Sequence, residues 1–70
     1  MFLIQTQTRA QALAMMEWRE AAELVSSRWQ TFLEAEAESR RWAYASYVAA
    51  LDAEEAAAAD VAVSYLCKAA

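Results

Sequence analysis

The side chains that could do chemistry are mostly carboxylates, because the 70 residues include ten Asp and Glu, one Cys and no His. General acid–base catalysis most often uses His. Cys67 has only Lys68 as a neighbouring cation and no base to activate its thiol. We therefore predict that the protein is not an enzyme and that Cys67 is an incidental or structural thiol.

Metal and cofactor sites are disfavoured by the same residue types. Zinc sites need several Cys or His ligands, and di-iron sites of helical bundles combine Glu with a Glu-x-x-His motif. A chain without Gly also cannot form the Gly-rich loop that holds phosphates. Glu55 falls on an apolar stripe, and we expect it at the edge of that stripe, where it reaches water or pairs with an Arg across an interface. No metal and no cofactor is expected.

The aromatic side chains carry more information than the carboxylates. Trp18 and Trp29 are eleven residues apart, so they point in almost the same direction on a helix. Trp42, Tyr44 and Tyr47 cluster farther along. Trp and Tyr are enriched at interfaces, and this number exceeds what two thin helices can bury alone. The aromatics therefore indicate a core between two helices, an interaction surface, or both.

The composition is typical of a helical protein, since Gly and Pro are absent and Ala is the commonest residue. Thr8 and Gln11 match a capping box, which predicts a helix start. A stripe with helical spacing of three and four residues follows. Its members are Met15, Trp18, Ala22, Val25, Trp29 and Phe32.

A second stripe is out of phase with the first. It contains Tyr44, Val48, Leu51, Glu55, Ala58, Ala62 and Tyr65. One straight helix would have to rotate its apolar face between residues 33 and 43, and the segment 34–41 lacks large apolar residues. We predict an all-α, two-helix antiparallel hairpin with a turn near residues 36–40. The alternative is one long continuous helix in a coiled-coil assembly, which the Glu36–Arg40 spacing would support.

The chain is too short for more than one domain. We expect a single helical domain over residues 1–70, with one helix over 8–36 and a second over 40–67. Residues 1–7 are expected to form an extended arm or a frayed terminus. The apolar run Met1–Ile4 is too short for a signal peptide and lacks a basic leader, and a free Cys fits a cytoplasmic setting.

The charge balance bears on the choice of partner. The net charge of −4 arises in residues 34–70, so direct binding to nucleic acid is disfavoured. No apolar run is long enough to span a membrane. The predicted acidic surface consists of Glu34, Glu36, Glu38, Asp52, Glu54 and Glu55.

These patterns favour a small, non-enzymatic regulatory or adaptor module that acts through helix–helix packing. Because a chain of this size has a thin core, we expect a homodimer or higher oligomer, or a complex with another protein. The alternative function is a phage-type acidic inhibitor of a nucleic-acid-binding complex. The residues expected at the helix-packing or partner interface are Met15, Trp18, Val25, Trp29, Phe32, Trp42, Tyr44, Tyr47, Val48, Leu51, Tyr65 and Leu66.

Overall fold

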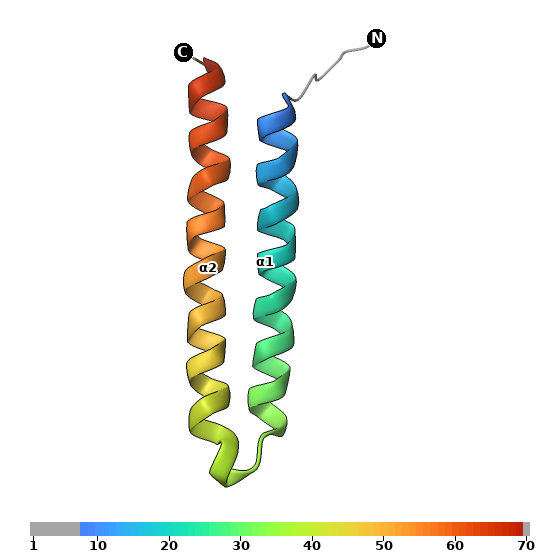
Figure 1. The fold of residues 1–70 in the computed structure, drawn as a ribbon, viewed down its shortest axis with the longest axis vertical. Coiled ribbons are helices and arrows are strands. Elements are labelled where there is room, and N and C mark those ends of the chain that lie inside the picture. The colour runs from blue at the N-terminus through green and yellow to red at the C-terminus, as the bar shows by residue number, and fades with distance from the viewer. Residues whose placement is uncertain (1–7, 70) are drawn as a thin grey trace.

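The computed structural model describes residues 8–69, and it describes side chains from residue 8 to residue 66. It contains two helices, α1 (Arg9–Glu34) and α2 (Ala37–Ala69), which lie antiparallel and pack along their length (Figure 1). The predicted helical hairpin is therefore confirmed, and the alternative of one continuous helix is not what the chain forms. The expected N-terminal arm, residues 1–7, lies outside the described residues.

The start of α1 is fixed by the predicted capping box. The Gln11 backbone N–H donates to Thr8 Oγ1 at 3.1 Å, and the Thr8 backbone N–H donates to Gln11 Oε1 at 3.0 Å. Each bond satisfies a backbone donor that the first helical turn leaves free. The Gln11 side chain is only 1% exposed, so the cap also belongs to the packed interface.

The turn is shorter than the sequence predicted. It consists of Ala35 and Glu36, so α2 begins three residues before the expected position. Ala35 has extended backbone angles (φ −72°, ψ 143°), and its N–H donates to the Phe32 carbonyl at 3.2 Å. The Ser39 N–H then donates to the Glu36 carbonyl at 2.9 Å. An extended residue closes this turn, which is why the hairpin forms without a Gly in a left-handed conformation.

The helices approach each other through small side chains. The buried apolar residues within the described part of the chain are Ala14, Ala43 and Ala50. Larger residues of α1 flank this contact and are half-buried, among them Trp18, Val25 and Phe32. The first predicted stripe is therefore the face of α1 that packs against α2.

The second stripe is not the face of α2 that packs against α1. The α2 residues with the least exposure on the α1 side form a row one position earlier in the sequence. This row, here called the α2 inner row, is Ala43, Tyr47, Ala50, Glu54, Ala57, Val61 and Ser64. Ala43 is 1% exposed and Tyr44 is 52% exposed. A shift of one residue turns the face by about 100°, so the stripe chosen for its large residues lies on a flank of α2 instead of facing α1.

Candidate interaction surface

Four aromatic rings form a closed cluster that joins the two helices near the turn. Trp29 lies 5.4 Å from Phe32 and 5.0 Å from Tyr47 between ring centroids. Tyr44 lies 5.6 Å from Phe32 and 6.3 Å from Tyr47. All four pairs are tilted and fall within the range of favourable aromatic contacts. This cluster unites four residues that the sequence assigned to helix packing.

The aromatic cluster is only partly shielded by the hairpin. Phe32 and Tyr47 are half-buried, whereas Trp29 and Tyr44 are 41% and 52% exposed. The cluster therefore has an inner side that holds the helices together and an outer side that faces solvent. Both interpretations offered for the aromatics, a core and a surface, describe part of this one group.

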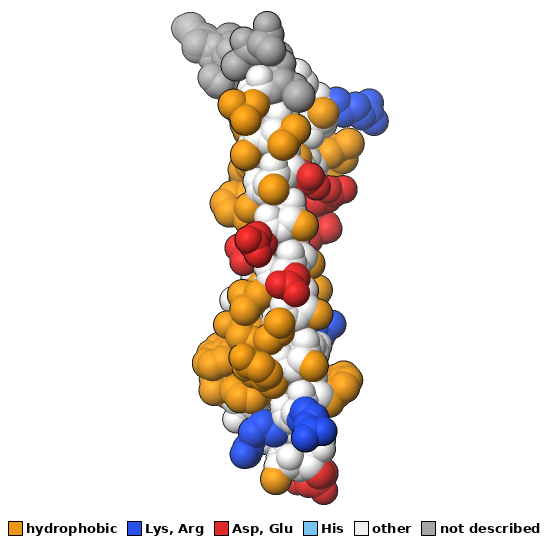
Figure 2. All heavy atoms as spheres, turned by 90° about the vertical axis from the view of Figure 1, so that its left-hand side faces the viewer, with side chains coloured by type: hydrophobic (Ala, Val, Ile, Leu, Met, Phe, Trp, Pro, Cys, Tyr) orange, Lys and Arg blue, Asp and Glu red, His pale blue; other side chains and the backbone are white. Residues whose placement is uncertain are grey.

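The apolar surface continues along α2 beyond the cluster. The second stripe, here called the α2 outer row, consists of Tyr44, Val48, Leu51, Glu55, Ala58, Ala62 and Tyr65. Val48 is half-buried, and most of the others are exposed. Figure 2 views the molecule from the α2 side and shows hydrophobic side chains along most of its length, with the largest group in the half nearer the turn. Contiguous apolar surface of this kind is uncommon unless something covers it.

The other predicted interface residues fall into two groups. Met15, Trp18 and Val25 are half-buried on the α1 face that meets α2. Trp42 and Leu66 are each 68% exposed and contribute little to closing the hairpin. Trp42 comes two residues before Tyr44, so it lies on the opposite flank of α2.

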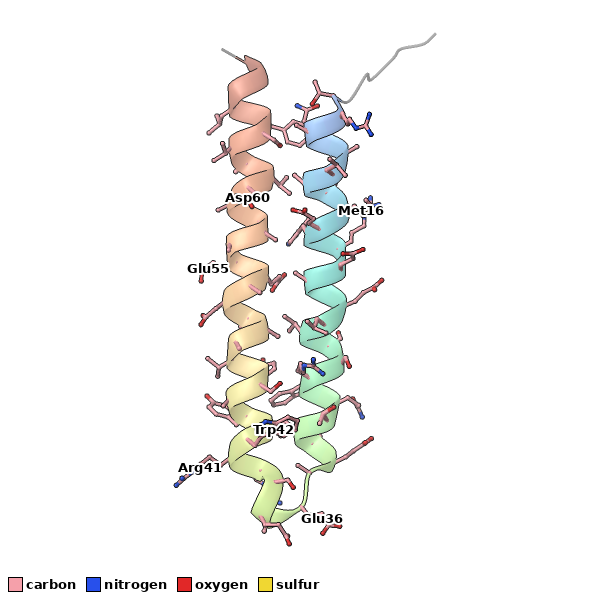
Figure 3. The ribbon with its side chains drawn as sticks, viewed as in Figure 1. Met16, Glu36, Arg41, Trp42, Glu55 and Asp60 are labelled. Carbon is pink, nitrogen blue, oxygen red and sulfur yellow. The ribbon has the colours of Figure 1, made fainter. Side chains whose placement is uncertain are left out.

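Trp42 borders a shallow hollow at the turn, with a volume of about 370 Å³. Figure 3 shows Trp42 on the near side of the hairpin, above the turn that carries Glu36. Two carboxylates and two hydroxyls share the hollow with the indole ring. The lining residues are Thr31, Glu34, Ala35, Glu36, Ser39, Trp42 and Ala43.

A smaller cavity of about 70 Å³ lies between the helices, beside Trp18, Ala58 and Val61. The indole N–H of Trp18 is buried and has no acceptor among the described residues. The packing of α1 against α2 is thus looser at this level than at the buried alanines.

The predicted acidic surface forms two separate groups. Glu34, Glu36 and Glu38 are exposed at the turn, and Asp52 and Glu55 are exposed about halfway along α2. Glu55 points away from α1 in Figure 3, as expected for a residue at the edge of the apolar stripe. Glu54 is instead half-buried in the α2 inner row, so the carboxylate that faces α1 is Glu54.

Two polar residues of the helix interface were expected elsewhere, Gln11 only at the helix cap and Glu54 on the acidic surface. The signal for Gln11 was present, because its position three and four residues before Ala14 and Met15 continues the α1 stripe. Glu54 was misplaced because the α2 inner row is made mostly of small residues, which carry a weak periodic signal.

Within the described residues, no group of three or more His, Cys, Asp and Glu side chains is arranged to hold a metal ion. Neither helix, over those same residues, has an apolar segment long enough to cross a membrane.

Comparison with known proteins adds no relative to this geometry: no family model matches the chain, and no curated protein or solved structure is significantly similar to it.

Proposed function

We propose that this protein is a small, non-enzymatic interaction module, regulatory or adaptor in kind, that acts by helix–helix packing and self-association. The proposal rests on one observation: on α2, the most buried side chains are small and several large apolar side chains are exposed. The most buried residues on the face toward α1 are Ala43 and Ala50, while Tyr44, Leu51 and Leu66 lie on the surface. Burying those side chains in a second interface would recover hydrophobic free energy that the single hairpin leaves unused.

The composition of the exposed surface supports an interface. Interface centres are enriched in Trp and Tyr, and residues such as Trp29 and Tyr44 present rings that the aromatic cluster already holds in place. A partner therefore meets pre-ordered side chains, and less conformational entropy is lost on binding.

The second function allowed by the sequence, an acidic inhibitor of a nucleic-acid-binding complex, has weaker support. Its carboxylates form two groups along α2, because Asp52 comes fourteen positions after Glu38, about 21 Å along the helix. The surface between them is largely apolar, whereas a mimic of nucleic acid would carry a continuous row of negative charge.

The proposal is tested by measuring mass and melting together. Light scattering should give a mass of at least twice the 7.8 kDa of one chain, and the melting temperature should rise with protein concentration. A single-chain mass with a concentration-independent, high melting temperature would reject self-association.

A further inference from the structure

The flank of α2 that carries the α2 outer row has a symmetrical order of charges and apolar residues. Arg41, Tyr44, Val48, Leu51 and Glu55 follow one another at steps of three and four residues, so they lie on one side of the helix. Figure 3 shows Arg41 and Glu55 both pointing away from α1. The face thus has a base at one end, an acid at the other and apolar side chains between.

Val48 lies at the centre of this order. Arg41 is seven residues before it and Glu55 is seven residues after it, so each is about 10.5 Å from Val48 along the helix axis. A two-fold axis through Val48 would therefore bring Arg41 of one copy level with Glu55 of the other, and the reverse. Tyr44 and Leu51 would close the apolar contact on either side of the axis.

We propose that this face is the self-association surface and that its occupant is the same face of a second copy, packed antiparallel about a two-fold axis near Val48. The inference rests on the proposed self-association and specifies its geometry. A two-fold interface uses one patch on both chains, so the patch must complement itself. The order of base, apolar centre and acid meets that requirement, because reversing the direction of the helix exchanges the two charges.

The charge distribution along α2 selects the antiparallel arrangement over the parallel one. Arg40 and Arg41 follow Glu38 near the start of the helix, and Asp52, Glu54, Glu55 and Asp60 lie from about its middle onward. Figure 2 shows basic side chains just above the turn, acidic side chains at the turn itself and a further acidic group near the middle of the molecule. Parallel packing would place Arg41 beside Arg41 and Glu55 beside Glu55, whereas antiparallel packing about Val48 places Arg41 of each copy level with Glu55 of the other. The opposed helix dipoles favour the same choice.

The proposed arrangement also uses the aromatic cluster. Tyr44 belongs both to the outer face of α2 and to the contact with Phe32. Packing at Tyr44 would therefore place two hairpins side by side, with four helices around a shared apolar centre.

Disulfide cross-linking tests the position of the axis. In a Cys67→Ser background, Val48→Cys should form a covalent dimer on mild oxidation, since the two thiols meet at the axis. Ala49→Cys is the matched control, because the next residue is exposed but turned about 100° away. Rapid cross-linking of the first variant alone supports the proposal, and equal cross-linking of both overturns it.

Charge reversal tests the orientation. Arg41→Glu and Glu55→Arg should each weaken dimerisation by about tenfold, because each places two like-charged pairs in the interface. An equimolar mixture of the two variants should associate as tightly as the wild type, since every pair is again of opposite sign. The Arg41→Glu, Glu55→Arg double variant should also regain wild-type dimerisation. In a parallel dimer, the double variant would dimerise no more tightly than the single variants, because residues 41 and 55 would each still face the same charge in the other copy.

These measurements distinguish a failure of the Val48-centred geometry from a failure of self-association, on which that geometry rests. A wild-type chain that stays monomeric at high concentration defeats both. A wild-type dimer that does not cross-link at Val48→Cys and tolerates both reversals overturns the Val48-centred geometry alone and leaves self-association in place.

Discussion

The two helices use their apolar residues differently. On α1, the large residues Trp18, Val25 and Phe32 lie on the face that meets α2. On α2, that face is lined mostly by small residues, and the larger Tyr44, Leu51 and Leu66 are exposed. Exposed apolar residues also occur on α1, such as Met16, which points away from α2 in Figure 3. The difference shows that a stripe of large side chains need not be the stripe that closes a hairpin.

The small residues set the spacing of the hairpin for a physical reason. A side chain such as Trp18 occupies the space between two helix axes, so the residue opposite has to be small for the backbones to stay close. The α2 inner row supplies Ala43, Ala50 and Ala57 for this purpose. Other large residues of α2, such as Leu51 and Leu66, are exposed by the hairpin.

The largest difference is expected when a charge is placed either on the face of α2 that packs against α1 or on its exposed side. Ala50→Asp puts a carboxylate at a position that is 5% exposed, and we expect it to lower the free energy of unfolding by about 3 kcal/mol because the charge has no partner there. Ala49→Asp, on the exposed side of the same turn, should change it by less than about 0.5 kcal/mol. Urea unfolding followed by circular dichroism measures both. Similar losses in the two variants would contradict the assigned register.

A second test compares two tryptophans of unequal contact. Trp29→Ala removes the ring that lies against both Phe32 and Tyr47, and should cost about 2 to 3 kcal/mol, somewhat less than for a fully buried ring. Trp42→Ala, at a position that is 68% exposed, should cost less than about 1 kcal/mol. Thermal melts of the two variants at one protein concentration provide the comparison. The reverse order would show that the hollow at the turn, and not the aromatic cluster, stabilises the hairpin.

A smaller effect is expected at the start of α1. Thr8→Ala removes the hydroxyl that accepts from the Gln11 backbone N–H and should destabilise the protein by about 1 kcal/mol. Thr8→Ser keeps a hydroxyl and serves as the control, with a change of a few tenths of a kcal/mol. Amide hydrogen exchange in the first turn of α1 should speed up in the Ala variant alone. Unchanged exchange there would mean that the cap does not hold the helix end.

The smallest effect concerns the looser packing beside Trp18. Val61→Ile adds one methyl-sized group next to the cavity of about 70 Å³ and should stabilise the hairpin by about 0.5 kcal/mol. The same change at Val63, which is exposed, should have no measurable effect. Chemical unfolding of the two variants gives the answer, and a loss of stability in Val61→Ile would show that the cavity cannot admit the added group.

Much of the fold was predictable from the sequence because its signals were local. The capping residues Thr8 and Gln11 identified the start of α1, and the phase change between the two stripes identified the hairpin. The length of the turn was not predictable, since it depends on the extended backbone of Ala35, and Ala carries no specific turn signal.

The candidate surface was predictable only in part. Its residue types mark Tyr44 and Leu51 as interface residues, which stays a prediction. The apolar period follows large side chains, whereas close helix packing depends on small ones such as Ala43 and Ala50. The row of α2 that faces α1 could therefore not be chosen from the apolar stripe.

Sedimentation equilibrium of Leu51→Asp beside Ala49→Asp tests most directly whether the α2 outer row is the self-association surface. We predict that Leu51→Asp keeps its helix content but sediments at the 7.8 kDa mass of one chain, while Ala49→Asp remains associated. Two variants with the same mass, whether both associated or both single chains, would contradict the claim that the outer row of α2 is the self-association surface.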